Sequence, residues 1–134
     1  MSNAADESRP PTVLVVEDEL IVAMALEDRL RDLGWQVVGT VATGEAAVEV
    51  AASEKPDLVL MDVRLAGPMG GAEAALRIVT ELGIRSIFMT AYSDPANAAR
   101  CAEAKPLGYI AKPHDDRVLV AELESALRHV RSAG

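Results

Sequence analysis

The sequence has one cysteine, one tryptophan, one phenylalanine and two tyrosines in 134 residues. A single cysteine, Cys101, excludes an internal disulfide, so we expect a reducing, cytoplasmic environment. We expect Cys101 at the surface or at the boundary of the core, as a small residue and not as a redox sensor. No apolar run approaches the roughly 20 residues of a membrane helix, and no signal peptide is recognisable, so no membrane span is expected.

Basic residues are also few: 13 Lys and Arg stand against 21 Asp and Glu, which gives a net charge of −8 and a pI near 4.7. A protein that binds a nucleic-acid backbone needs a basic stripe to displace counterions, so direct nucleic-acid binding is not expected. Half of the residues are apolar and a quarter are charged. This composition is typical of one compact globular domain.

Short β-branched apolar runs alternate with segments of helical periodicity five times along the chain. The expected strands cover residues 12–18, 35–41, 57–62, 86–90 and 108–112, and the expected helices cover residues 22–33, 45–53, 72–82, 94–104 and 115–131. Strands that are apolar on both faces and separated by helices are typical of a parallel sheet covered on both sides. We therefore predict an α/β fold with a doubly wound five-stranded parallel sheet in the order 2-1-3-4-5.

The chain divides simply. Residues 1–11 are polar and end in two prolines, so we expect a disordered N-terminal tail. Residues 12–131 are expected to form the single domain, and residues 132–134 a short tail. Because nothing else follows, the sequence fits both a stand-alone protein and a piece of a longer one.

Polar side chains gather at the predicted strand ends. Glu17 and Asp18 follow the first strand, Asp62 ends the third, Thr90 the fourth and Lys112 the fifth. The carboxyl ends of parallel strands meet at one edge, so these groups are expected to converge. Three carboxylates together need a cation, and all-oxygen ligands favour Mg²⁺ with a phosphate group. Asp62 is then the candidate nucleophile, with Lys112 and Thr90 on the phosphoryl oxygens.

Four motifs carry a family resemblance: "VLVVEDE", "DLVLMDVRL", "SIFMTAYSD" and "GYIAKP". In this order they resemble the receiver domain of two-component response regulators, over residues 12–130. The resemblance implies the flavodoxin-like (βα)5 receiver fold and a signalling domain, with no enzymatic activity beyond self-phosphotransfer and autodephosphorylation. It also implies that Asp62 accepts a phosphoryl group from a histidine kinase or a histidine phosphotransfer protein. Asp18, Asp62 and the backbone carbonyl of Arg64 would bind Mg²⁺, with Glu17 acting through bound water.

The same resemblance assigns the response to phosphorylation. Thr90 and Lys112 would hold the phosphoryl oxygens, and Tyr109 would be the aromatic switch that follows Thr90. The output face would be the fourth helix, fifth strand and fifth helix, at residues 94–104, 108–111 and 115–131. It would control a downstream protein partner or form a phosphorylation-dependent homodimer.

One segment departs from the family pattern. The loop after Asp62, "VRLAGPMGGAEAA", is one residue longer than the common form, and Gly70 stands where an acid is frequent. A glycine has no side chain to cap the following helix, so a weaker cap is predicted, at a cost of about 1 kcal/mol.

Simpler readings of single residues stay open. Asp62 alone could cap a helix, Glu17 and Asp18 could be first-turn acids, and Thr90 and Lys112 could be a strand residue and a surface charge. Tyr109 fits a core aromatic as well as a switch.

Three other functions also remain open. A phosphatase of the haloacid-dehalogenase type would need a second acid where Arg64 stands. A flavin carrier would need a phosphate-binding loop with G-x-G-x-x-G or G-K-[ST] spacing, which is absent here. A phosphorylation-independent scaffold is the third alternative, and the complete set of acids, Thr and Lys argues against it.

Overall fold

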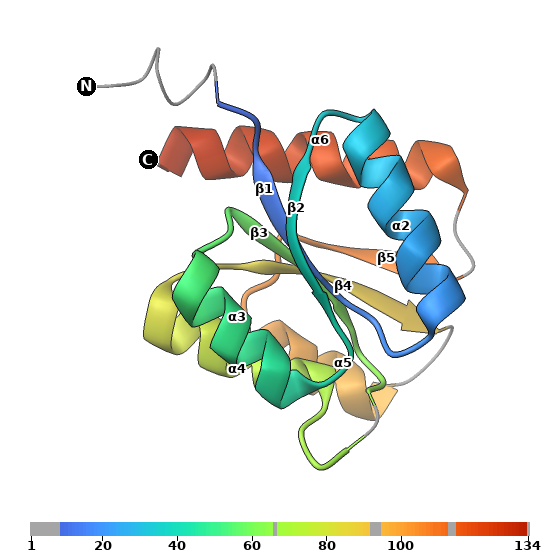
Figure 1. Ribbon diagram of the computed structural model, residues 1–134. Coiled ribbons are helices and arrows are strands. Elements are labelled where there is room, and N and C mark those ends of the chain that lie inside the picture. Colours follow the sequence, from blue (N-terminus) through green and yellow to red (C-terminus); the bar gives the residue numbers. More distant parts are fainter. Residues whose placement is uncertain (1–8, 66, 92–94, 113–114, 134) are drawn as a thin grey trace.

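The sheet of this protein is parallel throughout and has the predicted strand order. The computed structural model describes residues 9–65, 67–91, 95–112 and 115–133 (Figure 1). Its five strands lie in the order β2-β1-β3-β4-β5, and each pair of neighbours is parallel. The elements are β1 (Thr12–Val16), α2 (Leu20–Asp32), β2 (Gln36–Val41), α3 (Gly44–Glu54), β3 (Leu58–Asp62), α4 (Gly71–Leu82), β4 (Ser86–Ala91), α5 (Pro95–Glu103), β5 (Gly108–Lys112) and α6 (Asp116–Ala133). The predicted fold class is confirmed, and the predicted fourth and fifth helices are α5 and α6.

Two hydrophobic cores flank the sheet because successive strand residues face opposite layers. On β3, Val59 and Met61 belong to the core under α3, α4 and α5, whereas Leu58 and Leu60 belong to the core under α2 and α6 (Figure 1). All four side chains are fully buried. A strand covered on both faces has no polar side, which is why the sequence shows a continuous apolar run ending in an acid.

The expected position of Cys101 is wrong. Its residue is 2% exposed, and it packs in the same core as Phe88 and Ala104. The physical reason is the position of Cys101 on α5, on the side of the helix that packs against the sheet. A cysteine buried in such a place behaves as a small apolar residue.

Residues with positive φ follow helices α2, α3 and α4. Gly34 and Gly83 follow α2 and α4 with φ values of 93° and 73°, in the left-handed region that glycine favours. Helix α3 ends at Glu54, and its C-cap, Lys55, adopts φ 49° although it is not a glycine. At the start of α4, Gly70 is the N-cap and makes no side-chain cap hydrogen bond, as predicted.

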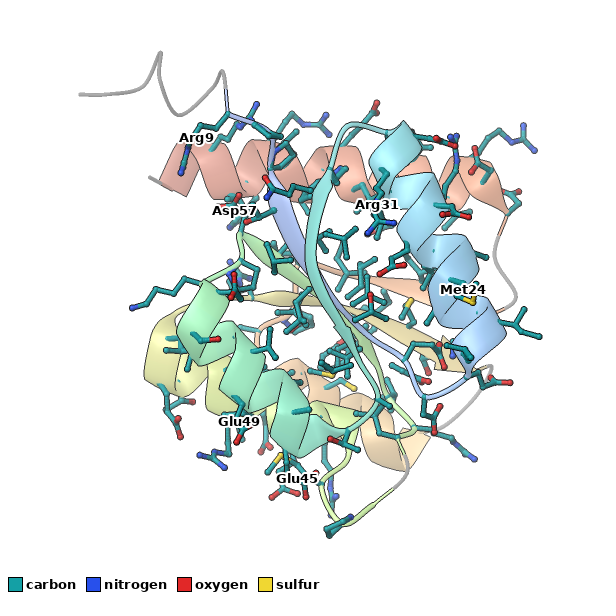
Figure 2. The ribbon with its side chains drawn as sticks, viewed as in Figure 1. Arg9, Met24, Arg31, Glu45, Glu49 and Asp57 are labelled. Atoms are coloured by element: carbon teal, nitrogen blue, oxygen red, sulfur yellow. The ribbon has the colours of Figure 1, made fainter. Side chains whose placement is uncertain are left out.

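Asp57 connects the beginnings of the neighbouring strands β1 and β3 (Figure 2). Its Oδ2 accepts hydrogen bonds from the Thr12 backbone N–H at 2.9 Å and from Thr12 Oγ1 at 3.2 Å. Its own backbone N–H donates to Thr12 Oγ1 at 2.9 Å. The β1 and β3 strands that carry the acids at their far ends are thus joined at their near ends as well.

We expect the Asp57→Ala substitution to lower the free energy of unfolding by about 2 kcal/mol, because it leaves two partly buried donors of Thr12 without their acceptor. Urea unfolding measures this difference. Glu49→Ala, at an exposed position on α3, is the control and is expected to change stability by less than about 0.5 kcal/mol. Equal stability of the two variants would contradict this role of Asp57.

Candidate functional site

Three acids converge where β1 and β3 end. Glu17 and Asp18 directly follow β1, and Asp62 is the last residue of β3. Val16 pairs with Met61, so the next residue of each strand, Glu17 and Asp62, stands at the same level. Each of the three acids offers one carboxylate oxygen, and these oxygens lie within 4.8 Å of one another. Glu17 and Asp62 are buried, at 2% and 5% exposure, while Asp18 is exposed.

A lysine from the edge strand β5 reaches two of these acids. Lys112 ends β5, which is separated from β3 by β4. Its Nζ donates to Glu17 Oε1 at 2.8 Å and to Asp62 Oδ2 at 3.1 Å. The structure therefore brings together Glu17, Asp18, Asp62 and Lys112, which the sequence places up to 95 positions apart.

Backbone amides hold the other oxygen of each buried carboxylate. Asp62 Oδ1 accepts a hydrogen bond from the Arg64 N–H at 3.0 Å, and Glu17 Oε2 accepts one from the Glu19 N–H at 3.0 Å. Both oxygens of each carboxylate therefore accept a hydrogen bond, which fixes the orientation of the carboxylate plane. Sequence reasoning missed these amide donors because every residue has one, and only the backbone path decides where it points.

The environment of Asp62 favours its neutral form. Burial is the largest cause, and the charge of Glu17 adds to it, while Lys112 and the Arg64 N–H act in the opposite direction. The balance raises the pKa of Asp62 from 3.8 to about 6. The carboxylate is therefore ionised at neutral pH, although its surroundings penalise that charge.

The two partners of Asp62 shift toward their charged forms. For Glu17, burial acts to raise the pKa, but the hydrogen bonds from Lys112 and the Glu19 N–H outweigh it, and the pKa is lowered. For Lys112, burial acts to lower the pKa, but its two carboxylate partners outweigh burial and the pKa is raised. At neutral pH the site holds three carboxylates and one ammonium, an excess of negative charge that a divalent cation would neutralise.

The donor set of this site fits a hard cation. Glu17, Asp18 and Asp62 supply only oxygen, and no cysteine or histidine belongs to the cluster among the described residues. Mg²⁺ prefers one or two carboxylates with water and phosphate oxygens, so these acids suit it better than a transition metal. The Arg64 N–H faces Asp62, and ligation by the Arg64 carbonyl stays a prediction.

Thr90 stands at the same edge of the sheet. It lies on β4 and pairs with Ala111, one residue before Lys112, while its neighbour Met89 pairs with Asp62. The Thr90 residue is half-buried. Strand register thus places a hydroxyl-bearing residue between the strands that carry the carboxylate and the ammonium.

Tyr109 lies on β5, three residues before Lys112 and therefore farther from the strand ends that carry the acids. Its ring stacks on Phe88, with centroids 6.0 Å apart and planes 27° apart, and the residue is 46% exposed. The side chain is therefore neither a fully buried core aromatic nor a residue of the acid cluster. Its role as a switch stays a prediction.

Comparison with known proteins points to one family. A model described as the response regulator receiver domain matches residues 13–124. The chain is 35% identical over 127 residues to the transcriptional regulatory protein PdtaR of Mycobacterium tuberculosis, which covers 95% of the chain and 62% of PdtaR. It is 34% identical over 122 residues to the phyllosphere-induced regulator PhyR of Methylorubrum extorquens, which covers 90% of the chain and 45% of PhyR. The chain thus spans less than two thirds of these relatives.

Solved structures agree. The receiver domain of a modulated diguanylate cyclase from Desulfovibrio desulfuricans superposes with a TM-score of 0.86 at 34% sequence identity, and the match covers 93% of this chain and 99% of that one. Among the described residues, no helix combines the length and apolarity that crossing a bilayer requires. The family model, the strand order and the acids at the strand ends agree, and the chain belongs to the response regulator receiver domain family.

Proposed function

We propose that this domain accepts a phosphoryl group on Asp62, with Mg²⁺ as its cofactor, and passes the signal to a protein partner. The observation that carries the proposal is the single ammonium of Lys112 shared between Asp62 and Glu17 beside a third acid, Asp18. This arrangement supplies a carboxylate that can act as nucleophile and the fixed positive charge of Lys112. Its excess of negative charge would be neutralised by a divalent ion.

The chemistry needs little beyond positioning. A carboxylate oxygen of Asp62 forms a bond to phosphorus as the bond from phosphorus to the donor's histidine nitrogen breaks, and the imidazole leaves with that electron pair. Lys112 and Thr90 bind the phosphoryl oxygens, and the backbone N–H of Arg64 keeps the carboxylate oriented. Bound Mg²⁺, held by Glu17, Asp18, Asp62 and the Arg64 carbonyl, would neutralise charge on the phosphoryl oxygens.

The donor in this proposal is a histidine kinase or a histidine phosphotransfer protein, and the output surface is formed by α5, β5 and α6. Phosphorylation adds negative charge and acceptor oxygens next to Thr90. Thr90 and Tyr109 then act as the switch that alters this surface, and a downstream protein or a second copy of the chain reads the change. We place these events in the cytoplasm and assign the domain no direct nucleic-acid contact.

The experiment that tests the proposal is intact mass spectrometry after incubation with acetyl phosphate. We expect one phosphoryl adduct on the wild-type protein with Mg²⁺ and at least about tenfold less with a chelator, because the acidic cluster repels a phosphate group without a cation. Asp62→Asn is expected to form no adduct. An adduct that is indifferent to both Asp62 and Mg²⁺, or no adduct at all, would favour the phosphorylation-independent scaffold.

A further inference from the structure

The loop after Asp62 returns directly to the peptide of Asp62. Helix α4 begins at Gly71, a buried residue whose backbone N–H donates to the Val63 carbonyl at 3.1 Å. We infer that Gly71 is a positioning residue for phosphoryl transfer, because the first turn of α4 rests on the Asp62 peptide and sets where the Asp62 carboxylate lies. This inference rests on the proposed function.

The space at Gly71 admits only a hydrogen atom. A Cβ built on Gly71 would overlap the carbonyl oxygen of Asp62 and lie 2.9 Å from both the Asp62 carbonyl carbon and the Val63 Cα. These are backbone atoms, so no rotamer change relieves the overlap. Gly71 is not among the glycines with positive φ, so the requirement is close approach and not an unusual backbone conformation.

A second glycine supports the other side of the same loop. A Cβ on Gly44, the first residue of α3, would lie 2.8 Å from the Met69 carbonyl oxygen and 2.9 Å from Met69 Cγ. Met69 therefore lies against the start of α3, two residues before Gly71 meets the Asp62 peptide. Gly70 provides no side-chain cap, and the Val63 carbonyl pairs with the Gly71 N–H at the start of α4.

A displacement of the backbone at Gly71 would be transmitted to the Asp62 carboxylate through the backbone of Asp62 itself. The Asp62 carboxylate is held by the Arg64 N–H at 3.0 Å and by Lys112 Nζ at 3.1 Å. Moving the Asp62 carbonyl to admit a methyl group would shift the peptide that carries this carboxylate, while Lys112 stays on β5. A misplacement of about 1 Å can reduce a rate about a hundredfold.

The neighbouring glycine supplies a matched control. At Gly70 the nearest atom to an added Cβ is the Val63 carbonyl oxygen at 3.9 Å, and φ is −79°, which every residue adopts. Gly70→Ala therefore adds the same methyl group without a clash. It loses about 0.5–1 kcal/mol at the N-cap. It tests whether a small loss of stability alone changes the phosphorylation rate.

The experiment compares Gly71→Ala and Gly70→Ala by three measurements: the rate constant for phosphorylation by acetyl phosphate at saturating Mg²⁺, the melting temperature, and the NMR shift and hydrogen exchange of the Arg64 amide without metal. We expect Gly71→Ala to react about 10- to 100-fold more slowly and to lose protection of the Arg64 amide. Gly70→Ala is expected to stay within about twofold of the wild type and to keep that protection.

A role of Gly71 in stability alone would lower the melting temperature and leave the rate and the Arg64 amide of the folded protein unchanged. That result would overturn the inference. If Gly71→Ala folds only with a stabilising osmolyte, the three measurements are made with that osmolyte in all the proteins, and an unchanged Arg64 amide and rate there would overturn the inference. A wild-type protein that takes no phosphoryl group would contradict the proposed function, while the metal-free Arg64 measurements would still test the positioning.

Discussion

Replacement of Lys112 by methionine is expected to lower the free energy of unfolding by about 2–3 kcal/mol at pH 7.5 without metal, and to reduce phosphorylation of Asp62 at least about a hundredfold. The ammonium is the shared partner of Glu17 and Asp62 at 2.8 Å and 3.1 Å, and both carboxylates are buried. Removing one partner of a buried ion pair costs about 3–5 kcal/mol, and the 24% exposure of the Lys112 side chain reduces this value.

Urea unfolding in the presence of a chelator measures the loss of stability. Lys55→Met, at an exposed position at the opposite end of the sheet from the acids, is the control and is expected to lie within about 0.5 kcal/mol of the wild type. Mg²⁺ should stabilise Lys112→Met at least as much as it stabilises the wild type, because the cation then neutralises carboxylates that have lost the Lys112 ammonium. Equal stability of Lys112→Met and Lys55→Met without metal would contradict this account of the site.

Asp62→Asn is expected to be more stable than the wild type at pH 7.5 without metal, by about 1–2 kcal/mol, and to lose this advantage as the pH falls to 4. The pKa of Asp62 is raised from 3.8 to about 6, so between these values the folded protein holds a proton that the unfolded chain has released. The contribution of Asp62 to stability is therefore fully present below about pH 4 and is lost as the pH rises through 6. One pKa unit corresponds to about 1.4 kcal/mol, so the full effect is at most about 3 kcal/mol.

Urea midpoints at pH 4, 5, 6 and 7.5 measure this crossover. Glu17 is present in both proteins, so its own lowered pKa largely cancels in the difference. Adding Mg²⁺ at pH 7.5 should reduce or reverse the advantage of Asp62→Asn, because the ion favours the ionised Asp62 of the wild type. A stability difference that stays constant from pH 4 to pH 7.5 would contradict the raised pKa.

The two predictions describe one property of the site. Glu17 and Asp62 are held ionised in a buried place with one ammonium between them, and Asp18 adds a third negative charge nearby. In the proposed function this loss of stability has a reason, because a carboxylate that attacks phosphorus must be ionised and partly free of water. Such local conflicts with stability are expected at functional sites and are offset by the packing of the two cores.

The fold was predictable because its signals are strong and local. Leu58, Val59, Leu60 and Met61 form an uninterrupted apolar run that only a strand covered on both faces explains. Parallel topology then places every strand end at one edge, so the gathering of Glu17, Asp18, Asp62 and Lys112 followed from the order of strands and helices alone.

The remaining features depend on distances that no periodicity contains. The burial of Cys101 follows from the rotation of α5 against the sheet, and the position of the Tyr109 ring from its stacking on Phe88. The role inferred for Gly71 depends on how closely α4 approaches the Asp62 backbone. Gly70 and Gly71 are neighbouring glycines, and the sequence does not tell which of the two lies against that backbone. Such close contacts arise only after the elements have packed.

Borohydride reduction of the phosphorylated protein, followed by peptide mapping, tests the central claim most directly, because it cleaves the acyl phosphate and marks the residue that carried it. The site offers three neighbouring acids, Glu17, Asp18 and Asp62, so the method separates the proposed acceptor from its closest alternatives. The account predicts reduction at Asp62 alone, and only after treatment with acetyl phosphate and Mg²⁺. Reduction at Glu17 or Asp18, or at none of the three in a protein that carries a phosphoryl adduct, would contradict it.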